Sequence, residues 1–239
     1  FGSRLSFGTA GLRGEMGPGP NRMNHATVRR AAFAFAQHLL TENTDVLNLG
    51  IVIGFDARHG SRELAIETAR VFGALDIPSY LYDECQPTPV IAHAITHLGA
   101  AGGVIVTASH NPPKDNGYKV YWGNGAQIIP PHDTRIGALI DSVVTPSEIE
   151  VADLETLQNK SVVRPVKPSV RATYFDEIMN ERVGSKHADL RVVYTAMHGV
   201  GYRTIQEALT RAGYDDLHPV VEQVEPDPEF PTVAFPNPE

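Results

Sequence analysis

The chain has 239 residues, 42% of them hydrophobic, which allows one large or two ordinary globular domains with a real core. Its formal net charge is -8, from 28 acidic and 20 basic residues, and no nucleic-acid-type run of Lys and Arg occurs. We therefore expect no nucleic-acid partner. Nothing resembles a signal peptide or a membrane span, and Cys85 has no second cysteine for an internal disulfide. These features favour a cytoplasmic protein with no membrane partner.

The first half of the chain alternates between helical and strand patterns. Asn24 is a good N-cap for a helix with a regular apolar stripe, and Met23 and Val28 are placed as a hydrophobic staple. The further elements expected are a strand at 51–53, a helix capped by Ser61, strands at 79–82 and 103–107, and a helix from about 89 to 98. This alternation predicts a parallel α/β layer.

A hairpin is expected after this layer. Asn116-Gly117 is a turn signal, and residues 118–122 are expected to form a strand that turns at 123–125 into a second strand at 126–129. An antiparallel hairpin beside parallel strands predicts an α/β fold with a mixed sheet flanked by helices. Two prolines then introduce a helix that is expected to end near residue 144.

Residues 145–169 have the weak periodicity of a connector, and we place a domain boundary there. The prediction is a complete first domain over 1–165 and the start of a second α/β domain over 166–239. In that second part we expect a helix at 171–182, a strand at 190–194, a helix at 202–212 ended by Gly213, and a strand at 217–221.

Residues 107–119 (TASHNPPKDNGYK) form the most informative segment. It begins just past a buried strand, where open α/β sheets bind ligands, and two prolines keep it from becoming helix. Ser109 is thereby presented outward as an oxygen nucleophile, next to His110 and Asn111. For an isolated Ser-His pair, a simple turn stabilised by these side chains would be the preferred interpretation.

This segment resembles the phosphoserine loop of the α-D-phosphohexomutases, and residues 8–14 (GTAGLRG) resemble the amino-terminal signature of that family. The resemblance implies a phosphoglucomutase or phosphomannomutase that interconverts hexose 1-phosphate and hexose 6-phosphate. Phosphoserine at Ser109 and a hexose bisphosphate intermediate would carry the phosphoryl group. Mg²⁺, held in part by a phosphoryl oxygen on Ser109, and hexose 1,6-bisphosphate as activator are also implied. We expect the full-length protein to be the enzyme and this chain alone to be inactive.

The proton of the reacting hydroxyl needs an acid or base. Lys119 lies on the opposite face of its strand from Tyr118 and Val120, so it can point toward the loop when those two side chains pack inward. The resemblance implies Lys119 or His110 for this role. Without it, a solvated lysine on a hairpin would be the simpler interpretation.

Three further residues are assigned to phosphate binding. Arg13 closes a glycine-rich segment and can bind phosphate bidentately, and the resemblance implies that it serves the phosphoserine together with Asn111. His198 lies in a glycine-bearing turn at 195–201, which the resemblance places in a cleft between two domains. Residues 56–60 also follow a strand, but an ordinary strand-to-helix turn explains them as well.

Metal-ligand patterns are weak in this sequence. The family's Asp-x-Asp-x-Asp-Arg magnesium loop is absent, so the remaining Mg²⁺ ligands are expected outside this chain. His93 and His97 have the spacing of a zinc helix, but Ala94 stands where a zincin has glutamate, which favours ordinary helix-face histidines. The acidic segment 225–229 favours a surface connector.

Two alternatives stay open. Residues 7–11 (FGTAG) also resemble family members that act on pentose phosphates, so a phosphopentomutase is the alternative enzyme. A non-catalytic phosphate-binding module is the alternative for this chain alone. The sequence leaves the preferred sugar and the oligomeric state undetermined.

Overall fold

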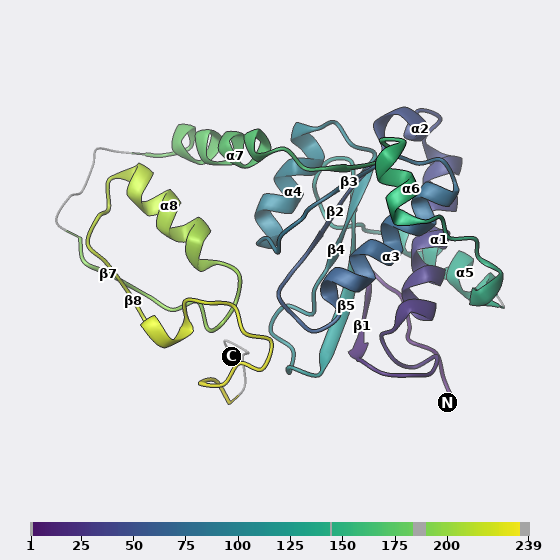
Figure 1. Ribbon diagram of the computed structural model, residues 1–239, viewed down its shortest axis with the longest axis horizontal. Coiled ribbons are helices and arrows are strands. Elements are labelled where there is room, and N and C mark those ends of the chain that lie inside the picture. Colours follow the sequence, from purple (N-terminus) through teal and green to yellow (C-terminus); the bar gives the residue numbers. More distant parts are fainter. Residues whose placement is uncertain (1, 144, 184–189, 235–239) are drawn as a thin grey trace.

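The computed structural model describes residues 2–143, 145–183 and 190–234. A larger unit with a six-stranded sheet is followed by a smaller unit with a two-stranded sheet (Figure 1). The strands of the larger sheet are β1 (Leu12–Glu15), β2 (Ile51–Phe55), β3 (Ser79–Leu81), β4 (Gly102–Val106), β5 (Asp115–Trp122) and β6 (Val163–Pro165). Its helices are α1 (His25–Glu42), α2 (Val46–Leu49), α3 (Ser61–Ala74), α4 (Thr88–His97), α5 (His132–Ser142), the short 3-10 helix η1 (Pro146–Glu148) and α6 (Leu154–Asn159).

The larger sheet is mixed, as the sequence predicts. Its order is β1-β5-β4-β2-β3-β6, with β2 parallel to β3 and β4, and β3 parallel to β6. Strand β5 runs antiparallel to both β4 and β1. The carboxyl ends of β2 and β4 therefore lie side by side at one edge, where open α/β sheets hold ligands.

Alternating side chains of the central strands supply two apolar layers. Ile53 and Val104 face the layer covered by α1, α3 and α5, whereas Val52 and Ile105 face the layer covered by α4. Both layers are fully buried, because a sheet with helices on both faces has no solvent side. Tyr118 belongs to the first layer and is 0% exposed, which leaves Lys119 on the α4 face of β5.

The smaller unit contains α7 (Pro168–Asn180), β7 (Val192–Tyr194), α8 (Tyr202–Ala212), β8 (Leu217–Pro219) and the 3-10 helix η2 (Val221–Gln223). Strands β7 and β8 pair in parallel. Helix α7 contacts both α4 of the larger unit and α8, and it lies above α8 and beside α4 in Figure 1. The helix and strand types expected in this part of the sequence are confirmed.

Capping predictions have mixed outcomes. Asn24 is the N-cap of α1 and its side chain accepts a hydrogen bond from the Thr27 N–H, as predicted. Ser61 does not cap α3: the cap position is Gly60, with φ 73°, and Ser61 is the first helical residue. The hydroxyl of Ser61 instead donates to Asp56 and accepts from Asn116, so it ties α3 to two other segments.

Asn116-Gly117 is not a turn but part of β5, which contradicts the sequence prediction. The Asn116 side chain is buried and donates to the carbonyl of His59 as well as to Ser61. A Cβ at Gly117 would lie 2.5 Å from the Thr107 carbonyl oxygen. Tertiary contacts across the sheet therefore select the strand over the turn that this dipeptide favours locally.

The region expected to be a connector is partly structured. Helix α6 and strand β6 lie in it, and β6 extends the larger sheet at the β3 edge. The hairpin after β5 is shorter than predicted, because only a single bridge between Tyr121 and Gln127 and nearby backbone bonds form the return. Within the described residues, no helix combines the length and apolar character needed to cross a bilayer.

Candidate functional site

Ser109 lies in the loop between β4 and β5 and is exposed. Its φ is 55°, in the left-handed region that few non-glycine residues adopt. The Ser109 N–H donates to the hydroxyl of Thr107 at 2.9 Å, which helps to hold this conformation. A residue kept in such a sparsely populated region is typical of active sites, where the surrounding structure offsets the strain.

Arg58 provides the main support of this loop. Its side chain is buried, and the guanidinium donates to the carbonyl oxygens of four loop residues. These are Ser109 at 2.7 Å, Asn111 at 2.6 Å, Pro112 at 2.9 Å and Asp115 at 3.0 Å. Since one planar group binds four backbone carbonyls, it fixes the path of the whole loop.

The Arg58 Nε atom lies 3.5 Å from Asp56 Oδ2, and the ring of Phe230 lies over the guanidinium at 5.2 Å from its centroid. Phe230 belongs to the smaller unit and is itself buried. The same arginine therefore connects the Ser109 loop, the end of β2 and a segment of the smaller unit.

Arg13 and Asn111 meet beside the loop. Arg13 Nη1 donates to Asn111 Oδ1 at 3.1 Å, and Asn111 Nδ2 donates to Asp115 Oδ2 at 2.9 Å. Arg13 reaches this place because β1 pairs antiparallel with β5, with Arg13 opposite Gly117. The strand pairing thus holds the Arg13 guanidinium against the Asn111 side chain of the loop that carries Ser109.

Gly11 makes this pairing possible. It has φ 76°, and a Cβ there would lie 1.9 Å from the Tyr118 carbonyl oxygen. At Gly8, by contrast, a Cβ would meet nothing within 4 Å. The glycine-rich entry therefore serves close strand packing at Gly11, in addition to any approach to an anion.

Lys119 and Gly117 lie on the same face of β5, the face toward α4, and Gly117 is the residue that pairs with Arg13 of β1. Burial lowers the pKa of Lys119, the positive charge of Arg13 lowers this pKa further, and the carboxylate of Asp56 opposes the shift. A larger fraction of Lys119 is therefore neutral near physiological pH than for an exposed lysine. That is the property a proton acceptor needs.

A cavity of about 280 Å³ lies between the two units. Its walls include Ser109 and Thr107 from the larger unit and His198, Asp227 and Phe230 from the smaller one. The segment expected to be a surface connector around residues 225–229 therefore contributes to the wall of this cavity. The resemblance implies a cleft between two domains for His198, and the structure places His198 in the wall of this cavity, which also includes Ser109.

The His198 side chain is buried and already has partners. Its Nε2 lies 2.8 Å from the Thr232 hydroxyl and accepts from the Thr232 N–H at 3.4 Å. Only Nδ1 is left for a ligand in the cavity, so its assignment to phosphate stays a prediction. His110 is exposed and is not among the residues that line the described walls of this cavity.

Arg58 is the residue that sequence reasoning underestimated. The signal was present, because residues 56–60 follow β2 and the carboxyl ends of neighbouring parallel strands meet at one edge. What the sequence alone could not supply is the β2–β4 adjacency that brings Arg58 under the Ser109 loop.

The described carboxylates around Ser109 do not form a magnesium site. Asp56 Oδ1 accepts from the Arg58 N–H and from the Ser61 hydroxyl, and Asp115 accepts from Asn111. Mg²⁺ requires an octahedral set of oxygen ligands, several of which are usually carboxylates or water. The residues present therefore do not fit a complete Mg²⁺ site.

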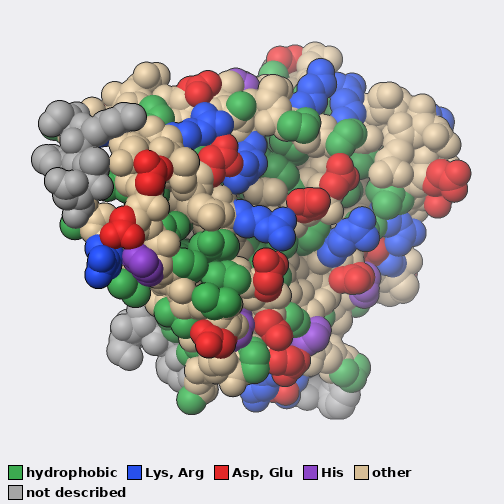
Figure 2. Space-filling model, turned by 60° about the vertical axis from the view of Figure 1, so that its left-hand side comes forward, with side chains coloured by type: hydrophobic (Ala, Val, Ile, Leu, Met, Phe, Trp, Pro, Cys, Tyr) green, Lys and Arg blue, Asp and Glu red, His purple; other side chains and the backbone are tan. Residues whose placement is uncertain are grey.

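A larger cleft of about 1210 Å³ also opens between the units. Its lining includes several arginines and several acidic residues from α3, α8 and the loops after β2 and β3. Figure 2 shows Lys and Arg side chains interspersed with Asp and Glu on the face that includes the smaller unit.

Two family models match the chain. Residues 4–146 match the phosphoglucomutase/phosphomannomutase alpha/beta/alpha domain I, and residues 172–239 match domain II of the same family. A solved structure from Thermus thermophilus, assigned as a phosphomannomutase, superposes with a TM-score of 0.80 and 27% identity. That match covers 99% of this chain and 49% of the other.

Among curated relatives, human phosphopentomutase is 40% identical over 248 residues, covering 100% of this chain and 40% of the relative. A phosphoglucomutase of Staphylococcus epidermidis is 37% identical over 235 residues, covering 98% of this chain and 42% of the relative. The chain thus spans about two fifths of the length of these relatives. With both domain models matched in order, the chain belongs to the phosphoglucomutase/phosphomannomutase family.

Proposed function

We propose that this chain carries the phosphoserine centre of a sugar-phosphate mutase, an intramolecular phosphotransferase, with Ser109 as the group that gives and regains the phosphoryl group. The observation that carries this proposal is the exposed, left-handed Ser109 on a loop whose four carbonyls are bound by the buried Arg58. Phosphoryl transfer depends mainly on positioning and charge stabilisation. The fixed path of this loop supports the first, and Arg13 on β1, bound to Asn111 of the loop, supports the second.

The proposed reaction has two transfers. In the first, a hydroxyl oxygen of a sugar monophosphate attacks the phosphorus on Ser109, the P–Oγ bond breaks, and a sugar bisphosphate forms. In the second, Ser109 Oγ attacks the other phosphate of the bisphosphate, which leaves the isomeric monophosphate and restores phosphoserine. The Arg13 guanidinium, held by Asn111, stabilises the negative charge of the transferring group.

Lys119 is proposed to take the proton of the attacking hydroxyl and to return it to the leaving oxygen. Its lowered pKa, caused by burial and by Arg13, supports this assignment. His110 is the second candidate for the proton, because it follows Ser109 directly and is exposed to the solvent side of the loop. Both roles remain proposals that substitution can separate.

Hexose phosphates are the first substrate class proposed, from the phosphohexomutase resemblance. Pentose phosphates are the second, and they are supported by the 40% identity to human phosphopentomutase, compared with 37% to the staphylococcal phosphoglucomutase. Hexose 1,6-bisphosphate as activator and Mg²⁺ belong to the same proposal. The remaining Mg²⁺ ligands are expected in the full-length protein, in the region that corresponds to the part of the relatives outside the match to this chain.

The full-length protein tests the proposal. Ser109→Ala should lower turnover of hexose and pentose 1-phosphates by more than about 10³-fold, because the reacting oxygen is lost. Ser161→Ala is the matched control, since Ser161 is also exposed and also left-handed, with φ 56°. It should retain wild-type turnover.

Near-normal turnover of Ser109→Ala would exclude the nucleophile assignment. If the wild-type protein turns over neither sugar class and yet binds sugar phosphates, the non-catalytic phosphate-binding module replaces the enzyme. The ratio of kcat/KM for the two 1-phosphates decides between hexose and pentose.

A further inference from the structure

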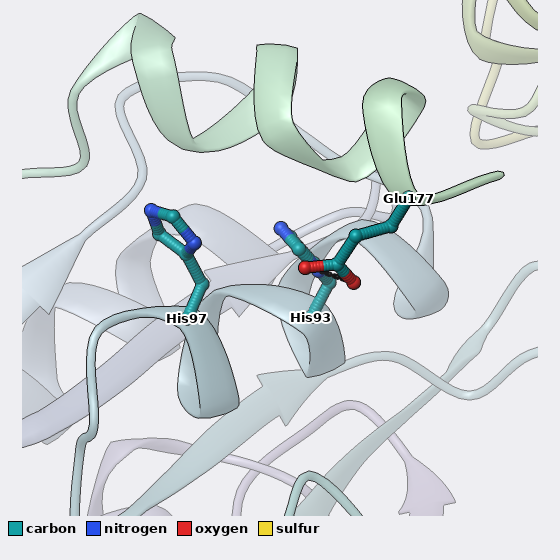
Figure 3. Close-up of side chains that lie close together, drawn as sticks. All are labelled: His93, His97 and Glu177. Carbon is teal, nitrogen blue, oxygen red and sulfur yellow. Dashed lines mark ion pairs between the residues drawn. The ribbon is translucent and has the colours of Figure 1, made fainter. Parts of the chain in front are cut away.

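Helices α4 and α7 bring together three metal-ligating side chains far from the Ser109 loop. His93 and His97 lie one turn apart on α4, with their rings stacked at 5.4 Å and an interplanar angle of 24°. Glu177 on α7 faces them across the helix contact, as Figure 3 shows. One ligand atom from each residue lies within 4.8 Å of the other two.

The fold brings a carboxylate to the two histidines, although the sequence pattern around His93 and His97 contains none. Ala94 stands where the zincin pattern has glutamate on the same helix, but Glu177 arrives from a segment more than 80 residues away, and its Oε2 lies 3.1 Å from His93 Nδ1. With metal–ligand bonds of about 2.0–2.1 Å and a tetrahedral angle, two ligands on one zinc ion lie about 3.3 Å apart. The observed separation is close to that value.

Neighbouring side chains orient the two imidazoles. The Thr173 hydroxyl donates to the Val170 carbonyl, so its oxygen is free to accept from His93 Nε2 at 3.1 Å and from His97 Nδ1 at 3.4 Å. The Tyr174 ring contacts His93 edge-on at 5.5 Å. Partners of this kind fix the tautomer and the direction of a ligating histidine.

The side chains of this site differ in their exposure to solvent. The His93 side chain is 7% exposed, whereas that of Glu177 is 65% exposed. One ligand is therefore rigid within the helix contact, and the site remains open to an ion from solvent.

We propose that His93, His97 and Glu177 bind a divalent first-row transition ion, with Zn²⁺ as the reference ion and water completing the coordination. Two imidazoles and a carboxylate suit such an ion, whereas Mg²⁺ prefers oxygen ligands, so the site is distinct from the magnesium chemistry of the proposed mutase. The ion joins α4 of the larger unit to α7, which also contacts α8. Binding therefore stabilises the packing between the two units.

The test uses the full-length protein, stripped of metal with a chelator and then kept in excess Mg²⁺ so that magnesium sites stay filled. Titration with Zn²⁺ by calorimetry should show one added site, and Co²⁺ should give the visible absorption of a site with nitrogen ligands. Thermal melting should shift upward with Zn²⁺ concentration, because an ion that binds only the folded state stabilises it.

His97→Ala and Glu177→Gln, both at exposed side chains, should lower Zn²⁺ affinity by roughly 10- to 100-fold or more, since even residues that only orient a ligand have effects of that size. His218→Ala and Glu181→Gln are the controls, an exposed histidine outside the site and an exposed acid at the end of α7. They should bind Zn²⁺ as the wild type does. Absence of a stoichiometric Zn²⁺ site, or equal loss in the controls, would overturn the proposal.

Discussion

Removal of the Arg58 guanidinium is the most informative perturbation of the Ser109 loop. Arg58→Met keeps much of the side-chain volume but removes four hydrogen bonds to the carbonyls of the loop. A hydrogen bond from a charged donor contributes roughly 1.5–3 kcal/mol, so four such bonds set a ceiling of about 12 kcal/mol and give about 6 kcal/mol at the low end of the range.

The expected loss is smaller than this ceiling for two reasons. Burial disfavours the charged Arg58, as the lowering of its pKa by desolvation shows, and the substitution removes that cost. The carbonyls of an exposed loop also regain water. We therefore expect the loop to lose about 3 kcal/mol of local stability, which equals one or two hydrogen bonds from a charged donor.

Native-state hydrogen exchange measures this quantity directly. The amides of Ser109, Asn111 and Asp115 each donate to an acceptor within the loop or at its start. A loss of about 3 kcal/mol should make their exchange roughly 100-fold faster. Arg58→Lys should give an intermediate effect, because one ammonium cannot span four carbonyls in a plane.

Arg62→Met is the control, since Arg62 is exposed on the neighbouring helix α3. It should change loop exchange by no more than about twofold, the effect expected of a surface substitution. If Arg58→Met leaves the exchange of the loop amides unchanged, the guanidinium does not hold the loop and this account of the site is wrong.

Three other predictions concern the site and its support. Arg13→Met should move the ascending limb of the kcat–pH profile to higher pH, because loss of the nearby cation raises the pKa of Lys119; an unmoved limb would exclude Lys119 as the titrating base. Gly11→Ala should destabilise the larger unit by about 2 kcal/mol or more, whereas Gly8→Ala should not. The assay is urea unfolding of this chain, followed by the fluorescence of its single tryptophan. Equal unfolding midpoints for the two variants would contradict the close approach of Gly11 to β5. Asn24→Asp should keep the N-cap of α1 but lose the hydrogen bonds from Nδ2 to three carbonyls. The free energy of unfolding should fall by roughly 1–3 kcal/mol in the same assay, and an unchanged midpoint would show that those bonds are dispensable.

Local features of the sequence predicted the elements whose signals are themselves local. The alternation of apolar runs and caps such as Asn24 depend on residues within a few positions of each other, and the mixed sheet and most helices follow from them. The placement of Lys119 and Tyr118 on opposite faces of their strand was also predictable, because successive side chains of a strand point to opposite sides of the sheet.

Features that depend on strand order were not predictable. Asn116 has turn propensity, and only its buried bonds to His59 and Ser61 place it inside β5. Arg58 lies beneath the Ser109 loop because β2 and β4 are neighbours, and Glu177 meets His93 because α7 packs on α4. Such contacts join residues tens of positions apart, which a single sequence does not reveal.

The most direct test of the central claim is the mass of the peptide that contains Ser109 in full-length protein purified from cells. We predict a phosphate on Ser109 that is lost on incubation with a hexose or pentose monophosphate and restored by the corresponding bisphosphate in the presence of Mg²⁺. A Ser109 that is unmodified and cannot be phosphorylated by either bisphosphate would contradict the claim.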